Sequence, residues 1–471
     1  MTKKTSDYST EISQIAHRLR SAKLVKAGIK TGFKVVESAF SRALGRKSKQ
    51  KSYEELLEQA IKYFVHEASE LKGGIMKAGQ LLSMYGEHFF PEEANKILKS
   101  LQSDSKPVAF SVMTKKIRRS LGEERFSRLN IDPHPLGAAS LGQVYSAKVF
   151  QNSAQTGQSQ SMAFKVQYPR VASAVESDLV LVKKLMTLLK IFPDAERFDG
   201  VYAEIKMMLY KEVDYARELG NFEKYQELLA DDPILKVPKV FPEFSTKTVL
   251  AMEHIHGRRL DDPVVQGLSQ TRRNQFALGL IRLLFREIFH WRVVQTDPHV
   301  GNFIVQLTED GYPQDALYLL DFGAVRKFPV TYINHFRSLA LAALENDPVR
   351  VLLYGKKIGF MMDSDSEELK NIFCRIVFKA VHPFAEEFAG TCALSGEYAS
   401  HEFDWSDLSV IHEVSKLARY GVVAFQMRAP PKEAVFIDRK LMGTTTLLKI
   451  LRAKIGPRRI ALEYLKEPPS K

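Results

Sequence analysis

Residues 293–305 read VVQTDPHVGNFIV, and this stretch decides the fold. Its two ends are apolar and typical of β-strands, but its middle holds an acid, a proline, a glycine and an amide. Asp297 and Asn302 therefore lie on one loop between two short strands. Taken alone, the pattern predicts only a turn, because Asp-Pro and Gly-Asn are ordinary turn residues. Chemistry on this loop has to be argued from the rest of the chain.

A second acidic residue ends a strand further along. Residues 316–325 read ALYLLDFGAV, which places Asp321 after a short apolar run and before Phe-Gly. Mg²⁺ prefers carboxylate and amide oxygens, and in phosphoryl-transfer sites it is bound together with nucleotide phosphates. The two loops therefore predict a site for a metal and a nucleotide. In it, Asn302 and Asp321 are the metal ligands, and Asp297 orients or deprotonates a nucleophile.

Upstream, the apolar strand AFKVQYP presents Lys165. A lysine there is unfavourable unless it meets an anion, which is either a phosphate or a carboxylate. The helical stretch KEVDYARELGNF supplies the available carboxylates: Glu212, Asp214 and Glu218. After it, VLAMEHIHG is interpreted as a strand that runs into a linker, where backbone groups near Glu253 meet an adenine.

These parts occur in the order found in the kinase-like superfamily, and the sequence resembles its UbiB family of atypical kinases. That family includes the mitochondrial coenzyme Q biosynthesis kinases. GGIMKAGQLLS carries the family's K-x-G-Q signature as Lys77 and Gln80, and KEVDYARE carries its E-x-D-Y. PLGAASLGQVY stands where ordinary kinases have a glycine-rich loop, and FIDRKLMG matches a C-terminal signature. The resemblance spans roughly residues 53 to 455.

The resemblance implies a protein-kinase-like α+β fold with two lobes and a helical extension that covers the active site. It implies ATP or ADP with Mg²⁺ as the cofactors. Lys165 would contact the nucleotide phosphates and pair with Glu218, the preferred glutamate. Lys77 and Gln80 would lie over the active site, near the residues of the E-x-D motif.

The loop that replaces the glycine-rich loop departs from the family pattern at its first position. Gly137 stands where the family has alanine, and Ala138, Ala139 and Ser140 follow. The resemblance implies that these residues bind the nucleotide. Glycine loosens the loop and can alter the preference between ATP and ADP. Ser140 either bonds the phosphate region or caps a turn.

The expected domains are a basic arm (1–52), a helical extension (53–125), an N-lobe (126–257) and a helical C-lobe (258–471). The arm has thirteen Lys and Arg against three acids, so it carries +10 of the net charge of +13. Its apolar residues recur at helical spacing. It either lies on an anionic membrane surface or packs on the body and exposes its charges. Nucleic acid is not an expected partner, because no recognised binding module is found.

The chain has two cysteines and no apolar run near the ~20 residues of a membrane span. We therefore expect a reducing compartment: the cytoplasm with peripheral membrane contact in a bacterium, or the mitochondrial matrix in a eukaryote.

The expected function is an ATPase or atypical small-molecule kinase that supports isoprenoid-quinone metabolism, with a lipid-like molecule and quinone-biosynthesis enzymes as partners. A nucleotide-gated lipid-binding protein is the alternative, and a protein kinase a weaker one, because the extension covers the site. The sequence leaves open whether the chain forms a homodimer.

Overall fold

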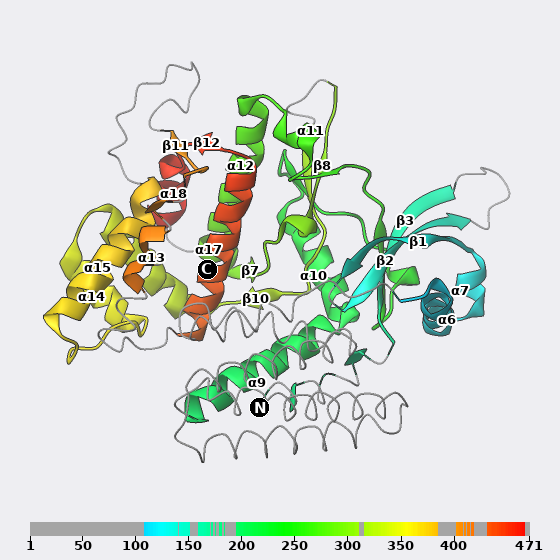
Figure 1. Ribbon diagram of the computed structural model, residues 1–471, viewed down its shortest axis with the longest axis horizontal. Helices are drawn as coiled ribbons and strands as arrows, with labels where there is room; N and C mark the ends of the chain where they lie inside the picture. Colours follow the sequence, from blue (N-terminus) through cyan, green and yellow to red (C-terminus); the bar gives the residue numbers. More distant parts are fainter. Residues whose placement is uncertain are drawn as a thin grey trace, which may run out of the picture.

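The computed structural model describes residues 108–139, 141–150, 159–169, 195–309, 315–384, 402–407 and 431–466, with single positions between 171–183 and 409–418. The expected arm and most of the expected extension lie outside these residues, as do Lys77, Gln80 and Ser140. The described residues form a β-rich lobe and a larger helical lobe (Figure 1).

The N-terminal lobe is built on a four-stranded antiparallel sheet. Its strands, in spatial order, are β1 (Leu129–Ala139), β2 (Gly142–Phe150), β3 (Ser159–Gln167) and β5 (Val249–Glu253). Helix α6 (Phe110–Leu121) and the short α7 (Glu123–Ser127) follow the expected extension in sequence. In α6, Met113, Ile117 and Leu121 recur every four residues and enter the core of the sheet. Although it falls within residues 53–125, α6 therefore packs as part of the N-terminal lobe.

Two helices follow β3 in the described part of the chain: α9 (Ala195–Glu212) and α10 (Tyr215–Leu228). The helical pattern breaks between them because Asp214 caps α10, its carboxylate accepting a hydrogen bond from the Arg217 amide at 3.3 Å. Helix α10 lies between the N-terminal sheet and the helical lobe (Figure 1).

The helical lobe begins with a second sheet in the order β4-β9-β8-β6. These strands are β4 (Leu235–Lys236), β9 (Ala316–Leu319), β8 (Phe303–Gln306) and β6 (Arg258–Arg259). Strand β4 falls within the expected N-lobe boundaries, but it pairs in parallel with β9 of the helical lobe. A separate ladder joins β7 (Val293–Gln295) to β10 (Val325–Lys327). The stretch VVQTDPHVGNFIV thus contributes its two halves to different ladders, and its polar middle connects them.

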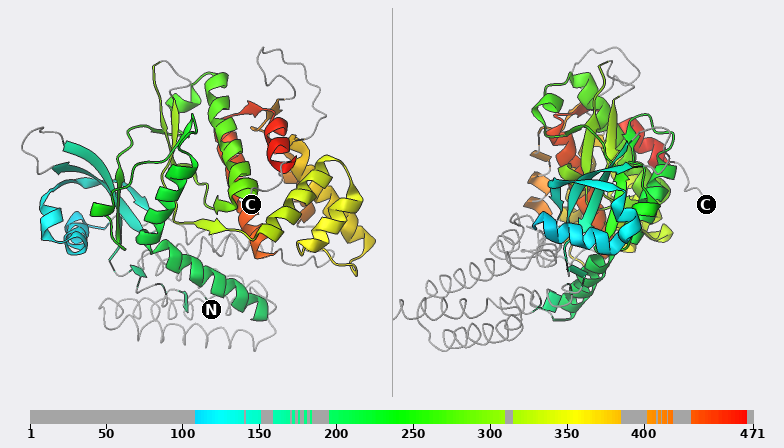
Figure 2. Two further views of the ribbon diagram at one scale, coloured as in Figure 1. Left: turned by 180° about the vertical axis from the view of Figure 1, so that it is seen from behind. Right: turned by 90° about the vertical axis from the view of Figure 1, so that its right-hand side faces the viewer.

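The remaining elements are mostly helices. They are α11 (Pro263–Gln266), α12 (Gln270–Phe285), α13 (Val330–Leu344), α14 (Pro348–Lys357), α15 (Glu367–Val381), α17 (Lys432–Ile450) and α18 (Arg458–Lys466). A π-helix, η2 (Arg286–Trp291), continues α12, and the short 3-10 helices are η1 (Pro242–Phe244), η3 (Val300–Asn302) and η4 (His382–Phe384). Strands β11 (Phe403–Asp404) and β12 (Lys454–Ile455) form a small antiparallel pair. Helices α12 and α17 run side by side (Figures 1 and 2).

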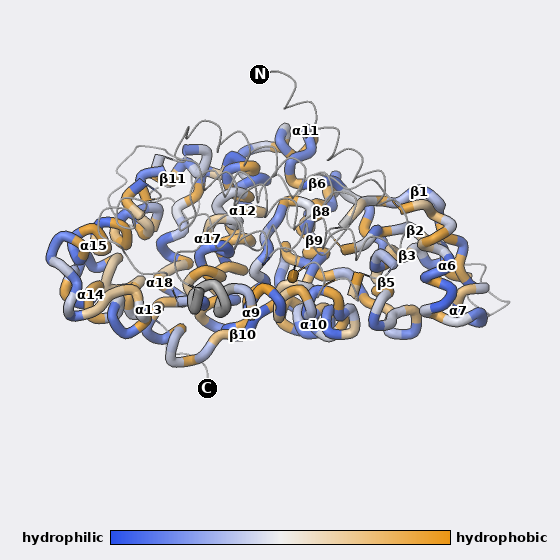
Figure 3. The backbone as a smooth tube through the Cα atoms, turned by 60° about the horizontal axis from the view of Figure 1, so that its bottom comes forward, coloured by the Kyte–Doolittle hydropathy of each residue, from blue (hydrophilic) through white to orange (hydrophobic). Residues whose placement is uncertain are grey.

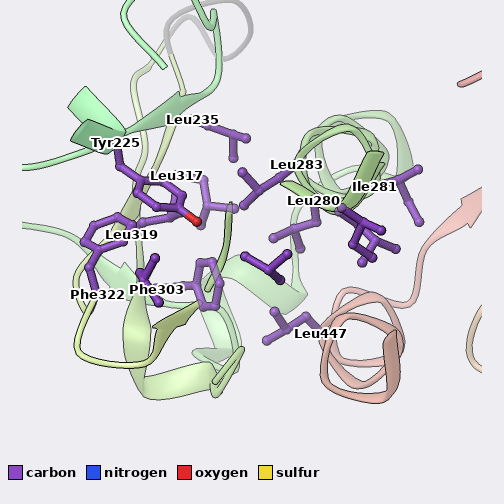
Figure 4. Close-up of a cluster of buried hydrophobic side chains, with 14 of the residues drawn as sticks. Tyr225, Leu235, Leu280, Ile281, Leu283, Phe303, Leu317, Leu319, Phe322 and Leu447 are labelled. Atoms are coloured by element: carbon purple, nitrogen blue, oxygen red, sulfur yellow. The ribbon is translucent and has the colours of Figure 1, made fainter. Parts of the chain in front are cut away.

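The main core runs from α12 and α17 to the second sheet and on to α10. Figure 4 shows Leu283 of α12 and Leu447 of α17 on one side, with Phe303, Leu317 and Tyr225 on the other. Each such buried apolar side chain contributes roughly 1.5–3 kcal/mol. Helices α13, α14 and α15 form a third cluster, after the main core and the core of the N-terminal sheet, and hydrophobic and hydrophilic stretches alternate along them in Figure 3. Every helix in the described part of the chain is too short or too polar to span a membrane.

Candidate active site

Lys165 lies between two carboxylates that come from different elements. Strand β3 carries the lysine, α10 carries Glu218, and the loop after β9 carries Asp321. The Lys165 Nζ donates to Glu218 Oε1 at 2.7 Å and to Asp321 Oδ2 at 2.9 Å. Glu218 is therefore the carboxylate of its helical stretch that reaches the lysine, whereas Asp214 caps α10 and Glu212 ends α9.

Burial and pairing set the charge states of this cluster. Lys165 is 8% exposed and Glu218 is 1% exposed. Burial by itself lowers the pKa of Lys165, but Asp321 and Glu218 outweigh burial and hold that pKa well above its usual range. Burial raises the pKa of Glu218 to about 7, although Lys165 opposes the shift. The protonation of Glu218 therefore changes close to neutral pH.

Helix α10 also holds the Asp-Phe-Gly loop. The Arg217 guanidinium donates to the carbonyl oxygens of Gly323 at 3.1 Å and Val325 at 2.6 Å. Asn221 donates through Nδ2 to the carbonyl oxygen of Phe322 at 2.8 Å. Sequence reasoning did not assign these two side chains, although they flank Glu218 at helical spacing. Together they fix the backbone that carries Asp321.

Phe322, the middle residue of this loop, is fully buried beneath α10. Its ring lies 4.7 Å from that of Phe222 and 4.4 Å from that of Tyr225. Aromatic pairs at these separations add ~0.5–1.5 kcal/mol to the energy of burial. The loop is thus anchored by an apolar side chain as well as by hydrogen bonds.

The loop between β7 and β8 folds around the carbonyl oxygen of Asp297. This oxygen accepts hydrogen bonds from His299 N at 2.8 Å, Gln295 Nε2 at 2.8 Å and Asn302 Nδ2 at 2.9 Å. Three donors on one acceptor restrain the backbone of the loop. The Asp-Pro and Gly-Asn pairs therefore make the turn that their types predict, and they also place the two polar side chains.

Asn302 and Asp321 are brought together by the backbone. Leu320 N donates to the carbonyl oxygen of Asn302 at 2.9 Å, so Asp321 follows the residue that faces Asn302. Asp321 Oδ1 accepts from Gly323 N at 2.9 Å, and a Cβ at Gly323 would lie 3.3 Å from this oxygen. One carboxylate and one amide oxygen fit Mg²⁺, which is bound by one or two carboxylates together with phosphate oxygens.

Helix α17 brings a cation to Asp297 from a distant part of the chain. Arg439 Nη2 lies 2.5 Å from Asp297 Oδ1. The next residue, Lys440, places its Nζ 2.5 Å from Glu287 Oε2 of the π-helix. Sequence reasoning assigned neither cation to the site. The available signal was the match of FIDRKLMG, residues 436–443, to a family signature.

The predicted nucleotide-binding residues of the N-terminal lobe lie on its sheet. Gly137 and Ala138 lie near the end of β1 and pair with Val144 and Gln143 of β2, so the alanine-rich stretch is one arm of a hairpin. Ala139 pairs with Gly142 next to the tip. Among the described residues, no atom lies within 4 Å of a Cβ built on Gly137, so none of them requires glycine there.

Glu253 ends β5, where the sequence predicted contact with an adenine. Its side chain is exposed, and its backbone N–H donates to the carbonyl oxygen of Lys239 at 2.7 Å. This N–H is therefore already used inside the protein. Lys77, Gln80 and Ser140 lie outside the described residues, so their expected positions stay predictions.

Both lobes thus contribute charged side chains to one site, with the predicted phosphate-binding lysine on the β-rich lobe and the predicted metal ligands on the helical lobe. This division defines a kinase-like enzyme. The chain matches the family described as "ABC1 atypical kinase-like domain" over residues 100–354, more than half of its length, and it belongs to that family. The resemblance to the UbiB family of atypical kinases is confirmed.

The similar proteins agree with this assignment. The chain is 29% identical to "Atypical kinase COQ8B, mitochondrial" of Rattus norvegicus, over 86% of this chain and 71% of that protein. It is 28% identical to "Atypical kinase COQ8, mitochondrial" of Saccharomyces cerevisiae, over 85% of this chain and 75% of that protein. The Danio rerio COQ8B protein is 27% identical over 87% of this chain, which spans only 61% of that relative.

A solved structure of Rv3197 from Mycobacterium tuberculosis, in complex with erythromycin, has the same fold. The TM-score is 0.56 and the sequence identity 23%, covering 89% of this chain and 100% of that chain. At this identity the likeness concerns the fold alone. It confirms the expected kinase-like α+β architecture.

Proposed function

We propose that the chain binds ATP or ADP with Mg²⁺ and acts as an ATPase or as an atypical kinase of a small, lipid-like molecule. The observation that carries the proposal is the position of Lys165 between Glu218 and Asp321, at 2.7 and 2.9 Å. A buried lysine that joins a helix glutamate to the Asp of Asp-Phe-Gly matches the arrangement that binds nucleotide phosphates beside a metal.

Each residue has a distinct part in this proposal. Lys165 contacts the nucleotide phosphates, and Glu218 holds the lysine in place. Asn302 and Asp321 hold Mg²⁺, which neutralises charge on the phosphates when bound. Asp297 orients the nucleophile, either water or an acceptor hydroxyl, and accepts its proton where the acceptor is a hydroxyl.

The segment after Asp-Phe-Gly supports a small acceptor. In protein kinases, an activation loop lies between Asp-Phe-Gly and a later Ala-Pro-Glu motif. Here β10 begins two residues after Gly323 and α13 begins at Val330, so no long loop is inserted. This connection offers little platform for a protein substrate, which favours ATP hydrolysis or a small molecule.

The names of the relatives support a place in coenzyme Q biosynthesis. The rat and yeast proteins are both called mitochondrial atypical kinases of the COQ8 type. We infer that this chain likewise supports isoprenoid-quinone metabolism, at a membrane surface and alongside quinone-biosynthesis enzymes. The basic residues 1–52 are the proposed membrane contact, because Lys and Arg near an anionic surface each contribute ~1 kcal/mol.

ATP hydrolysis by the purified chain, with and without liposomes that contain anionic lipid, tests the proposal. We expect turnover that liposomes raise, that Asp321→Asn abolishes, and that loses its lipid stimulation when residues 1–52 are removed. Asp363→Asn is the matched control, because it makes the same change in an exposed carboxylate between α14 and α15 that pairs with Lys356, outside the site. If nucleotide binds but turnover stays at the Asp321→Asn level throughout, a nucleotide-gated lipid-binding protein becomes the better assignment.

A further inference from the structure

Within one and a half turns, helix α17 contacts the loop of Asp297 at two places and the preceding π-helix at a third. Arg439 meets the Asp297 carboxylate, Lys440 meets Glu287 beneath the loop, and Gly443 lies against Pro298. The helix begins at Lys432, more than a hundred residues after the loop. Two contacts on the loop, and a third on Glu287, which accepts a hydrogen bond from Gln295 N at the end of β7, indicate more than general packing.

The contact between Arg439 and Asp297 is charged and largely shielded from water. The two side chains are 15% and 17% exposed, and Nη2 lies 2.5 Å from Oδ1. Charge-assisted hydrogen bonds of this kind are roughly twice as strong as neutral ones. Exposed ion pairs contribute little to stability because water screens them, but this pair is mostly shielded from water. The orientation of the Asp297 carboxylate is therefore set by a guanidinium on α17.

The backbone of the same loop is fixed through Lys440. Its partner Glu287 accepts hydrogen bonds through Oε1 from Tyr225 Oη at 2.7 Å and from Gln295 N at 3.1 Å. Gln295 in turn donates through Nε2 to the carbonyl oxygen of Asp297 at 2.8 Å. A continuous series of polar contacts thus runs from Lys440 to the residue that Arg439 also holds.

Gly443 sets the distance between the helix and the loop. A Cβ at this position would lie 2.3 Å from Pro298 Cγ and 3.2 Å from the Pro298 carbonyl oxygen. The helix backbone therefore packs directly on the residue after Asp297. Arg439 lies one turn earlier on the same face, so its guanidinium projects from a backbone that has little freedom to move.

We propose that Arg439 is a positioning residue for Asp297, and that α17 belongs to the catalytic centre through it. The inference rests on the proposed function and extends it. Arg439 fixes the Asp297 carboxylate before the nucleophile arrives, which reduces the reorganisation needed during the reaction. A displacement of about 1 Å in such a group is enough to lower turnover ~100-fold.

Arg439→Ala and Arg439→Lys test this role against Lys449→Ala, which removes an exposed cation from the same helix. We expect Arg439→Ala to lower kcat by ~100-fold and to leave nucleotide Kd within about twofold, because Lys165 and Asp321 are untouched. Added guanidinium should restore part of the turnover of Arg439→Ala, with sodium chloride at equal ionic strength as the control. Lysine should rescue poorly, because it lacks the planar fork of arginine.

Hydrogen exchange at the amides of His299 and Asn302 supplies a second readout that needs no turnover. Both amides bond within the loop, to Asp297 O and His299 O, and Arg439→Ala should speed their exchange while Lys449→Ala does not. Unchanged exchange, or turnover equal to that of Lys449→Ala, would overturn the role of Arg439. If the wild-type chain does not hydrolyse ATP, only the proposed function is contradicted. The hydrogen-exchange result still decides whether Arg439 holds the loop.

Discussion

Replacing Lys440 by methionine should destabilise the chain by about 3–5 kcal/mol, because it leaves the charge of Glu287 buried without its partner. Lys440 is 2% exposed and Glu287 is 0% exposed, and their charged atoms are 2.5 Å apart. Methionine fills nearly the same volume as the lysine stem, so the loss of packing is small. The predicted loss therefore comes almost entirely from the unpaired carboxylate.

A second substitution separates this cause from general damage to α17. Glu287→Gln removes the negative charge but keeps an oxygen that can accept from Tyr225 and Gln295. The double variant Lys440→Met with Glu287→Gln should therefore recover most of the stability that Lys440→Met loses. The coupling energy from the double-mutant cycle should lie near the upper end of the ~0.5–3 kcal/mol measured for residues in contact.

Thermal and urea unfolding of the four chains measure both quantities. At ~2–4 °C per kcal/mol for a unit of 150–250 residues, Lys440→Met should lower Tm by roughly 6–20 °C. Lys449→Met is the control, an exposed position on the same helix, and should change stability by less than ~0.5 kcal/mol. A loss below ~1 kcal/mol for Lys440→Met, or a double variant no more stable than the single one, would refute the reasoning.

Three further predictions concern the site and its glycines. Because the pKa of Glu218 is raised from 4.5 to about 7, its protonated form stabilises the fold at low pH, and this stabilisation is lost as pH rises from 4.5 through 7. Turnover should change in the opposite sense and rise through about pH 7 as ionised Glu218 pairs with Lys165; a pH–rate profile of Glu218→Gln should lack this step. Gly443→Ala should cost ~1–3 kcal/mol and lower turnover, since its Cβ would meet Pro298, whereas Gly220→Ala, with no described atom within 4 Å, should be neutral or stabilising in an unfolding assay. Gly137→Ala, whose Cβ would have no neighbour within 4 Å in the described part of the chain, should raise stability by ~0–1 kcal/mol. The ratio of ATP to ADP affinities, measured by calorimetry, should change if the freedom of this loop sets the preference.

The parts of the site that could be predicted from the sequence are those whose chemistry restricts the residue type. A metal ligand has to be an oxygen donor, and a lysine on an apolar strand has to meet an anion. These constraints led to Asn302, Asp321 and Lys165, and the structure places Lys165 against Asp321 at 2.9 Å. Their roles in binding and catalysis stay predictions until nucleotide binding and turnover are measured.

The parts that could not be predicted depend on contacts between distant segments. Arg439 and Asp297 are separated by 142 positions, and nothing in their local sequence says that they meet. Strand β4 is only two residues long, so its pairing with β9 instead of a neighbour in sequence depends on the tertiary fold. Periodicity likewise predicts a helix before Val293 but not the π-helix that turns Glu287 toward the buried face.

Two helices, each from a different part of the chain, therefore control two loops of one site. Helix α10 holds the loop of Asp321 through Arg217 and Asn221, and α17 holds the loop of Asp297 through Arg439. The loops are joined to each other by the backbone bond from Leu320 to Asn302. Changes in α10 should accordingly impair nucleotide binding and turnover together, because Asp321, the proposed metal ligand, moves with its loop. Changes at Arg439 should impair turnover alone. A substitution that lowers both nucleotide affinity and turnover has therefore displaced the loop of Asp321, whereas one that lowers only turnover has displaced the loop of Asp297.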